Sequence, residues 1–294
     1  MSSQLEQFSN NYIPIINQQM LNEIKKLQAP SQLIESMNYS LAAGGKIIRP
    51  LLLLATLETF GKDVNKGLDI ACALEMVHTY SLIHDDLPSM DDDDFRRGKP
   101  TNHKKFGEAL AILAGDGLLT YSFQLIAEAE GLTDEQKVKL IALFSKCAGP
   151  EGMVGGQVAD IEAENRQLNV DELQYIHENK TGRLLSFAAV AGAIIADANE
   201  EQINLVKEYA YHIGIAFQIR DDILDVIGKE EDLGKPVGSD FGNEKSTYPA
   251  LLTLDGAKKA LNDHIQMAKQ KINKLQMNID LLEQLATKIE ERNH

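Results

Sequence analysis

Apolar residues recur at intervals of three and four positions along most of the chain, the spacing of one face of an α-helix. The first such stretch runs from Leu5 to Leu27 and stops before Pro30. A second begins at Ser31 and is broken by Gly44 and Gly45, and a third begins near Pro50. Further helices are predicted over 66–84, 106–130, 134–148, 171–179, 182–197, 200–227 and 257–292.

The pattern contains no block of alternating apolar and polar residues and no Asn-Gly hairpin signal, so no strand is predicted. Proline is scarce, with 8 in 294 residues, which favours long uninterrupted helices. No low-complexity linker divides the chain. The sequence therefore predicts an all-α fold, organised as a single domain over residues 1–294.

Charge and composition narrow the classes of partner. The chain has 29 basic and 44 acidic residues and a formal net charge of −15, which argues against nucleic acid and anionic membrane surfaces. The apolar run from Pro50 to Thr56 is far shorter than the roughly 20 residues that span a bilayer, and the N-terminus lacks a signal-peptide pattern. Cys72 and Cys147 are too few for a disulfide framework. We expect a cytoplasmic protein without a membrane span.

Two clusters of aspartates follow or interrupt apolar helical stretches. The first is DDLPSMDDDD at 85–94, and the second comprises Asp221, Asp222 and Asp225 within FQIRDDILDVIG. Crowded carboxylates repel one another, and oxygen-only ligands suit a hard cation such as Mg²⁺. A solvated acidic loop is the alternative for the first cluster. An EF-hand does not fit, because the glycine and glutamate at its sixth and twelfth positions are missing.

Basic residues beside glycines are candidate phosphate ligands. Lys46 and Arg49 follow Gly44-Gly45 just before a helix start, where the helix dipole favours an anion. Such a pair is as often simply solvated. Arg96 and Arg97 come directly after the first aspartate cluster. Lys180, Lys235 and Lys245 are further candidates, because each lies near a glycine or in a predicted turn. His78 lies seven residues before Asp85.

Taken in order, these motifs resemble those of trans-isoprenyl diphosphate synthases. The resemblance covers about residues 36 to 255. It rests on GGKIIRP, EMVHTYSLIHDDLPSMDDDDFRRGKPT, GGQVADIEAE, KTG, FQIRDDILDVIG and GKPVGSDFGNEKSTYPALL. One departure is Ile47, where the family often has arginine; Lys46 and Arg49 are kept, so little loss is expected.

The resemblance implies a role for each motif residue. The residues for the diphosphate of isopentenyl diphosphate are Lys46, Arg49, His78 and Arg97, and Gly45 is a further substrate-binding residue. Those for the allylic diphosphate are Arg96, Lys180 and Lys235, and Thr181 and Gln218 line the carbocation's path. About three Mg²⁺ ions, replaceable by Mn²⁺, are implied. Two are held by Asp85 and Asp91 with Asp86 nearby, and the third by Asp221, Asp222 and Asp225.

The implied fold is a helical bundle around a central active-site cavity, usually a homodimer. The implied reaction joins isopentenyl diphosphate to dimethylallyl and then geranyl diphosphate, giving C15 farnesyl diphosphate. Magnesium and basic residues would neutralise the leaving diphosphate, and a closed apolar cavity would keep water from the carbocation. A bulky residue near Tyr80, with Ser81, would set the chain length. Helical geometry alone does not place the Tyr80 ring under the growing chain, and core packing is an equal alternative.

Three other functions stay open at this stage. A geranylgeranyl diphosphate synthase of the same family would differ only in product length. A terpene cyclase would not need a second diphosphate site, so Lys46, Arg49, His78 and Arg97 argue against it. A non-catalytic subunit would be expected to have lost one aspartate motif, and both are intact here.

Overall fold

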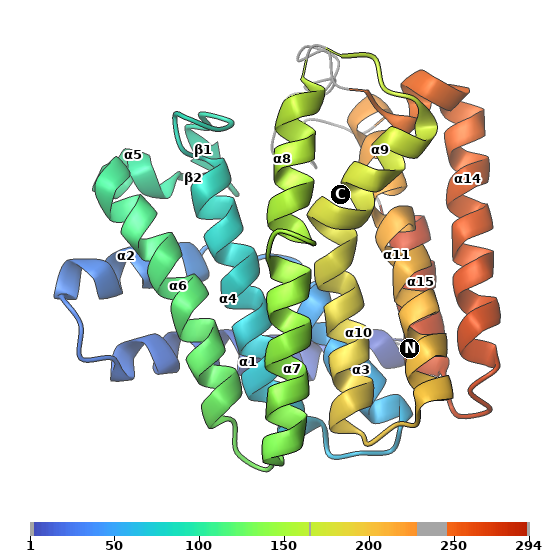
Figure 1. Cartoon of the computed structure of the whole chain (residues 1–294), viewed down its shortest axis with the longest axis horizontal. Helices are drawn as coiled ribbons and strands as arrows, with labels where there is room; N and C mark the ends of the chain where they lie inside the picture. The colour runs from blue at the N-terminus through green and yellow to red at the C-terminus, as the bar shows by residue number, and fades with distance from the viewer. Residues whose placement is uncertain (1–2, 165, 228–245, 293–294) are drawn as a thin grey trace. The chain divides into compact units, whose positions relative to one another are not determined.

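A computed structural model describes residues 3–164, 166–227 and 246–292 of the chain. In these ranges the secondary structure is helical except for one short β-hairpin, so the predicted all-α class is confirmed (Figure 1). Contacts within the backbone divide the chain into two compact units. The first comprises Met1–Leu54 and Asp63–Ile141, and the second comprises Ala55–Lys62 and Ala142–His294.

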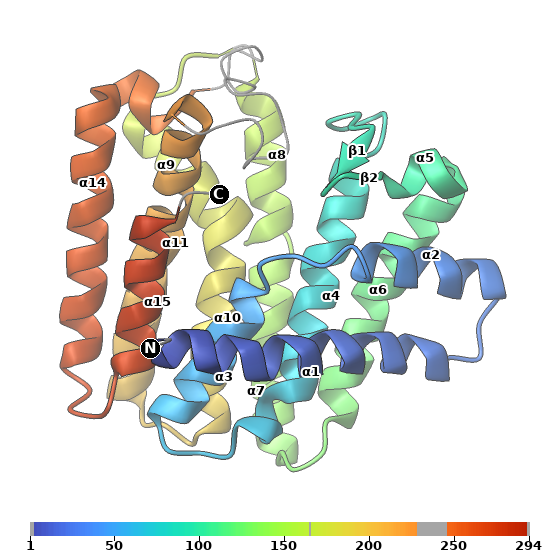
Figure 2. The ribbon, with the colours of Figure 1, turned by 180° about the vertical axis from the view of Figure 1, so that it is seen from behind.

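The first unit is built around the apolar helix α4. Its complete helices are α1 (Gln4–Lys26), α2 (Ser31–Leu41), α4 (Leu68–Asp85), α5 (Asn102–Phe106) and α6 (Glu108–Glu128), while α3 (Ile48–Thr59) and α7 (Asp134–Ala148) have residues in both units. Helix α4 packs against α1, α2 and α6, and Figure 2 shows α1 running across it. Every residue from Ile70 to Val77 is buried, so this helix forms the core of the unit.

Local sequence explains where α1 begins and which face it buries. The Ser3 hydroxyl accepts a hydrogen bond from the Glu6 amide at 3.1 Å, and the Glu6 carboxylate accepts one from the Ser3 amide at 2.9 Å. This reciprocal pair satisfies amides that the first turn leaves without partners. Leu5, Ile16 and Met20 of the predicted apolar face are buried.

A short β-hairpin was not predicted. Strands β1 (Phe95–Arg96) and β2 (Lys99–Pro100) pair antiparallel, with Arg96 opposite Lys99. Arg97 and Gly98 form the two-residue turn with φ of 54° and 72°, as a tight hairpin turn with two left-handed residues requires. A glycine supplies only the second of these positions, which is why the sequence carries a weak hairpin signal.

The second unit centres on the long helix α11. Its other complete helices are α8 (Met153–Ala163), α9 (Val170–His177), α10 (Arg183–Ile195), α14 (Tyr248–Asn273) and α15 (Asp280–Glu291), and α11 spans Glu200–Ile227. Helix α11 packs against α10, α14 and α15 (Figure 1).

The predicted single helix over 257–292 is wrong, because the chain turns between α14 and α15. No glycine or proline marks residues 274–279; Gln276 takes the left-handed conformation with φ of 55°. Leu275 and Ile279 are buried on either side of it, and Asn278 accepts a hydrogen bond from the Asp280 amide at 3.1 Å. Burial of the two flanking side chains stabilises a turn that the local residue propensities do not predict.

Among the described residues, α6 is the one helix long and apolar enough to cross a membrane by length and composition alone. Its most apolar window has a mean hydropathy of 1.4, and 39% of that window is buried. Helix α6 packs against α2, α4 and α5.

Candidate active site

The first aspartate cluster folds back on the end of α4. The Asp91 amide donates to the Asp85 carbonyl oxygen at 2.8 Å, so two residues six positions apart become neighbours. Pro88 and Ser89 form the exposed tip between them. The cluster is therefore a closed loop in which the backbones of two of the three predicted metal ligands are adjacent, rather than an extended acidic segment.

Arg96 is bound to this loop. Its Nε donates to Oδ1 of Asp86 at 2.7 Å, its Nη2 lies 2.6 Å from the same oxygen, and Nη2 also contacts Asp93 at 3.4 Å. Asp86 is 3% exposed. Burial raises the pKa of Asp86, and the hydrogen bond and charge of Arg96 oppose that rise. The arginine thus compensates a buried carboxylate that the sequence assigned to the metal site.

Arg97 belongs to a different set of side chains. A Cβ added at Gly45 would lie 2.7 Å from Nη2 of Arg97, so the guanidinium packs directly on the glycine backbone. The charges of Arg49, on α3, and of Arg97 both act on His78, on α4, and Arg97 also acts on Arg49. The structure therefore brings together Gly45, Arg49, His78 and Arg97, which the resemblance had assigned to substrate binding; we call these four residues the arginine pocket.

The arginine pocket is electropositive. Its residues Gly45 and Arg97 are exposed, and Arg49 and His78 are half-buried. Burial, followed by the charges of Arg49 and Arg97, lowers the pKa of His78 well below its ordinary value, so the imidazole is neutral at physiological pH. Burial also lowers the pKa of Arg49, whose Nε is buried without a hydrogen-bond partner. A buried donor that lacks a partner is a group that an incoming anion would satisfy.

The loop before α3 presents Lys46 to solvent. Its neighbour Ile47 is 4% exposed and takes a φ of 50°, which is unusual for a β-branched residue. Gly44 and Gly45 also have positive φ, of 75° and 155°. Burial of Ile47 anchors the loop, and Lys46 stands exposed beside the arginine pocket.

Sequence reasoning missed Glu75. This residue lies one helical turn before His78 on α4 and is 4% exposed. Arg49 and Arg97 are the charges that act on it. The signal was available, since a glutamate in the middle of an apolar helix is rare, but the charges that act on it lie 26 and 22 residues away in the sequence.

In the second unit, a π-helical segment over Glu178–Gly182 carries Lys180 and Thr181. Such segments inside helices are frequent at functional sites. The predicted helices 171–179 and 182–197 thus run together through this segment instead of being separated. A Cβ added at Gly156 would meet the Lys180 amide nitrogen at 2.1 Å, so only glycine permits this approach of α8.

The predicted ligands of this segment point to neighbours within the unit. Lys180 Nζ donates to Oδ2 of Asp160 at 2.7 Å. The Thr181 hydroxyl donates to the Gln218 side-chain oxygen, and Gln218 Nε2 in turn lies 3.4 Å from Oδ2 of Asp221. The structure therefore links Thr181 and Gln218 to the first aspartate of the second cluster.

The three aspartates of the second cluster have different surroundings. Asp222 accepts hydrogen bonds from the Tyr248 amide at 2.9 Å and pairs with Nε2 of His177 at 3.3 Å, which ties α11 to the start of α14. Asp225 is 5% exposed. The side chain of Asp221 is 42% exposed and forms an ion pair with Arg292.

Arg292 is a second residue that sequence reasoning missed. Its guanidinium lies 4.4 Å from the centroid of the Phe217 ring, and its carbonyl oxygen accepts a hydrogen bond from Nε of Arg220 at 2.6 Å. Burial lowers the pKa of Arg292 to about 10. No motif surrounds this residue near the C-terminal end, so spacing gave no signal that it would reach Asp221.

Some of the predicted site cannot be placed. Lys235, and most of the GKPVGSDFGNEKS motif, lie outside the described residues. Within the described ranges no three Asp, Glu, His or Cys side chains converge into a metal-binding group. The two aspartate clusters belong to different units, and the magnesium assignment stays a prediction.

Tyr80 and Ser81 lie in the last turns of α4. Tyr80 is 6% exposed, and its ring packs edge-on against His84 with centroids 5.5 Å apart. Burial, then the charges of Asp85 and Asp116, raise the pKa of Tyr80 to about 12. Ser81 donates to the His78 carbonyl oxygen at 2.8 Å. Their chain-length role stays a prediction.

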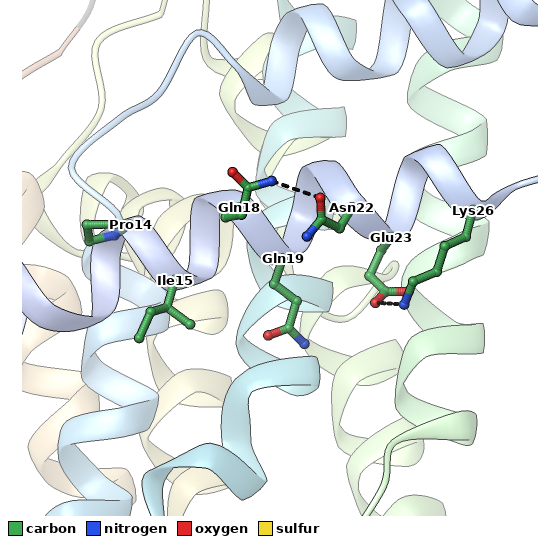
Figure 3. A pocket seen from close by; sticks show the side chains of 7 residues that line it. All are labelled: Pro14, Ile15, Gln18, Gln19, Asn22, Glu23 and Lys26. Carbon is green, nitrogen blue, oxygen red and sulfur yellow. Dashed lines mark hydrogen bonds and ion pairs between the residues drawn. The ribbon is translucent and has the colours of Figure 1, made fainter.

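A hollow of about 600 Å³ lies over α1, between Pro14 and Lys26, apart from all of these residues (Figure 3). Its polar side chains already have protein partners: Gln18 donates to Asn22 at 2.8 Å, Lys26 to Glu23 at 2.6 Å and Gln19 to Asp69 at 2.6 Å. All of its lining comes from one helix. It offers no converging set of chemical groups.

Comparison with known proteins assigns the chain to a family. A model of the polyprenyl synthetase family matches residues 30–282. The chain is 54% identical over 296 residues, covering 100% of both chains, to a farnesyl diphosphate synthase of Bacillus subtilis (strain 168). It is 53% identical, over 99% of this chain and 98% of the relative, to one of Geobacillus stearothermophilus.

Solved structures agree with this assignment. An FPP/GFPP synthase from Zymomonas mobilis matches with a TM-score of 0.86 and 32% identity over 99% of each chain. The chain therefore belongs to the polyprenyl synthetase family, and the resemblance drawn from motif order is confirmed.

Proposed function

We propose that this chain is a farnesyl diphosphate synthase, a prenyltransferase that joins isopentenyl diphosphate to dimethylallyl and then geranyl diphosphate. The observation that carries the proposal is the division of two adjacent arginines. Arg96 binds Asp86, whereas Arg97 packs on Gly45 in the arginine pocket. These different surroundings of the two arginines support two separate diphosphate sites, as a reaction between two diphosphates needs. The two full-length bacterial relatives are named for this activity.

The arginine pocket, with Lys46, binds the diphosphate of isopentenyl diphosphate. Guanidinium groups present several N–H donors in a fixed plane and suit a phosphate better than a point charge does. The unpartnered Nε of Arg49 supplies one such donor. Neutral His78 adds a hydrogen bond without adding charge. This diphosphate does not leave during the reaction, so its ligands bind and orient the substrate.

The allylic diphosphate is held by Arg96, Lys180 and Lys235 and by magnesium on the two aspartate clusters. The donors fit that ion because they are carboxylates, and a backbone hydrogen bond makes the main chains of Asp85 and Asp91 neighbours. The second cluster adds Asp221, with Asp222 and Asp225. About three Mg²⁺, or Mn²⁺ in their place, would neutralise the diphosphate as it leaves.

The protein then protects the allylic carbocation until the second substrate attacks. Thr181 and Gln218 present oxygen atoms whose dipoles stabilise positive charge along its path. Their mutual hydrogen bond, and the link from Gln218 to Asp221, fix both side chains. The final proton leaves to the departing diphosphate, and no protein base is assigned to it.

Product length is proposed to be C15, limited by Tyr80 and Ser81 in the last turns of α4. Tyr80 is held by its contact with His84. The His84 ring packs closely on Gly115 of α6, where a side chain would leave no space for the ring. A rigid aromatic ring can act as the floor of a cavity. The alternative is a geranylgeranyl diphosphate synthase with a C20 product.

The deciding experiment is product chromatography. The purified chain is incubated with Mg²⁺, labelled isopentenyl diphosphate, and either dimethylallyl or geranyl diphosphate. A C15 diphosphate from both primers is expected. A C20 product would select the geranylgeranyl alternative, a cyclised hydrocarbon would select a terpene cyclase, and no turnover by the single chain would select a non-catalytic subunit.

We further propose that the chain works in the cytoplasm as a homodimer, without a membrane span, and that residues 1–294 form one catalytic domain. The family match from 30 to 282 runs through both units. Helix α6 exposes Ile112 and Leu113, at 42% and 55%, as a self-associating surface would. Light scattering coupled to size-exclusion chromatography gives the mass directly, and a monomer at micromolar concentration would contradict the dimer.

A further inference from the structure

The hairpin that carries Arg96 and Arg97 is too short to hold its own position. Each strand has two residues, and Arg97 and Gly98 form the turn between them. A two-stranded hairpin by itself is at best marginally stable in water. Phe95, the first residue of β1, is 68% exposed, so apolar burial does not fix this end of the hairpin. Contacts with the rest of the unit must therefore set where the two arginines lie.

One such contact is made by Asn102, two residues after β2 ends. Its Oδ1 accepts a hydrogen bond from the Ser36 hydroxyl at 2.8 Å, and its Nδ2 donates to the Ser36 carbonyl oxygen at 3.0 Å and to the Ser40 hydroxyl at 2.8 Å. Asn102 is 2% exposed and Ser36 is 0% exposed. Both N–H donors of this amide and its oxygen are thus bonded to a single helix, α2. Breaking such buried bonds leaves polar groups that water cannot easily satisfy.

Two further hydrogen bonds join the hairpin to α2. The Tyr39 hydroxyl donates to the Pro100 carbonyl oxygen at 2.7 Å, and Lys99 Nζ donates to the carbonyl oxygen of Ala42, at the end of α2, at 3.3 Å. Both bonds are exposed, so water can replace either partner at little cost. Asn102 therefore supplies the buried part of the attachment between the hairpin and α2.

Thr101, between β2 and Asn102, extends this attachment to the first aspartate cluster. Its hydroxyl donates to the Asp93 carbonyl oxygen at 2.8 Å, and its amide donates to the Asp94 carbonyl oxygen at 3.0 Å. These bonds close the hairpin at its base. The segment that Asn102 anchors therefore runs from the end of the aspartate cluster through both arginines.

We propose that Asn102 is a positioning residue that fixes the hairpin on α2 and thereby holds Arg96 and Arg97 at their separate diphosphates. This inference rests on the proposed function. Asn102, Arg96 and Arg97 line one cavity of about 30 Å³, so the anchor and both arginines lie close together. Each arginine is assigned to one substrate, whereas the hairpin carries both. Loss of the anchor is therefore expected to weaken the binding of both substrates, a result that neither arginine variant gives alone.

The test combines kinetics with hydrogen exchange. Asn102→Ala should raise the KM for isopentenyl diphosphate and the KM for geranyl diphosphate together, each by about tenfold, the effect of weakening one charge-assisted hydrogen bond. Amides in the peptide 86–106 should exchange faster than in the unmodified protein. Asn102→Asp keeps the volume and the oxygen acceptor but loses both donors, and should show the same two effects. Ser40→Ala removes one of the three bonds and should change both KM values less.

Gln19→Ala is the matched control. It also removes a side-chain amide that joins two helices of the same unit, because Nε2 of Gln19 on α1 donates to Asp69 on α4 at 2.6 Å. Its melting temperature should fall while both KM values and the exchange of 86–106 stay unchanged, which separates a loss of stability from a loss of position. Asn102→Ala in an Arg97→Ala background should raise the KM for isopentenyl diphosphate less than it does alone, because the residue acts through that arginine.

Unchanged KM values for both substrates in Asn102→Ala, or a rise for only one of them, overturn the inference. So does unchanged hydrogen exchange over 86–106. If Asn102→Ala does not fold, Ser40→Ala decides by the same criteria. Failure of the proposed function is a separate result: the unmodified chain would then not consume isopentenyl diphosphate, while hydrogen exchange would still report whether Asn102 anchors the hairpin.

Discussion

Replacing Gly45 with alanine puts a methyl group where the guanidinium of Arg97 now packs. The added carbon would lie 2.7 Å from Nη2 and 2.8 Å from Cζ and Nη1. Ordinary contact begins at 3.4 Å, so the guanidinium must retreat by about 0.7 Å. A hydrogen bond of typical length stretched by that amount falls outside the range in which it counts as one.

The cost follows from the strength of charge-assisted hydrogen bonds. Losing one between Arg97 and a diphosphate is worth about 1.5–3 kcal/mol. That corresponds to a rise of roughly 10- to 150-fold in the KM for isopentenyl diphosphate. The KM for the allylic substrate should change little, since Arg96 faces Asp86 and not Gly45. Alanine at a φ of 155° also costs about 1–3 kcal/mol of folding stability.

Gly44→Ala is the control that separates backbone strain from the steric clash with Arg97. Gly44 has a φ of 75°, but a Cβ there meets no atom within 4 Å. Both variants should therefore melt a few degrees lower, at about 2–4 °C per kcal/mol, and only Gly45→Ala should raise the KM. The assay is initial-rate kinetics with each substrate varied in turn, alongside thermal melts. Equal KM values for isopentenyl diphosphate in the two variants would refute the reasoning.

Three further outcomes are expected. Turnover should stop in excess chelator, and Asp85→Ala or Asp221→Ala should lower kcat by several orders of magnitude; full activity with chelator would remove the metal from the mechanism. Arg97→Ala should mainly raise the KM for isopentenyl diphosphate and Arg96→Ala should mainly impair use of the allylic substrate, so identical profiles would contradict the division. Tyr80→Ala should deepen the cavity and give C20 and longer products by chromatography; if farnesyl diphosphate remains the sole product at full rate, the ring is only core packing.

The sequence predicted helices well where their signals are local. The apolar spacing and the Pro30 stop located α1, and the first aspartate pair, Asp85-Asp86, marked the end of α4. These features depend on neighbours within one or two turns, so one segment contains all the information. The turn between α14 and α15 was missed because Gln276 adopts its conformation under packing from Leu275 and Ile279.

For the candidate site, too, the sequence predicted some features and missed others. The order of the motifs was enough to identify Arg49, His78 and Arg97 as candidate site residues, because the spacing between a family's motifs can be read from the sequence alone. Spacing could not show that Arg96 and Arg97, adjacent in sequence, turn to different partners; a two-residue hairpin turn with left-handed Arg97 separates them. Nor could it show that the charges of Arg49 and Arg97 act on the buried Glu75.

What the sequence by itself determined was the helical class, the order of the motifs and the chemistry of the residues in them. What only the tertiary structure decided was which charges meet. Arg292 reaches Asp221 across 71 positions, and Tyr248 donates to Asp222 across 26. Coulomb energy depends on distance and burial in space, and separation along the chain fixes neither. The charged partners of this site are therefore a property of the fold, although each residue that forms them is plain in the sequence.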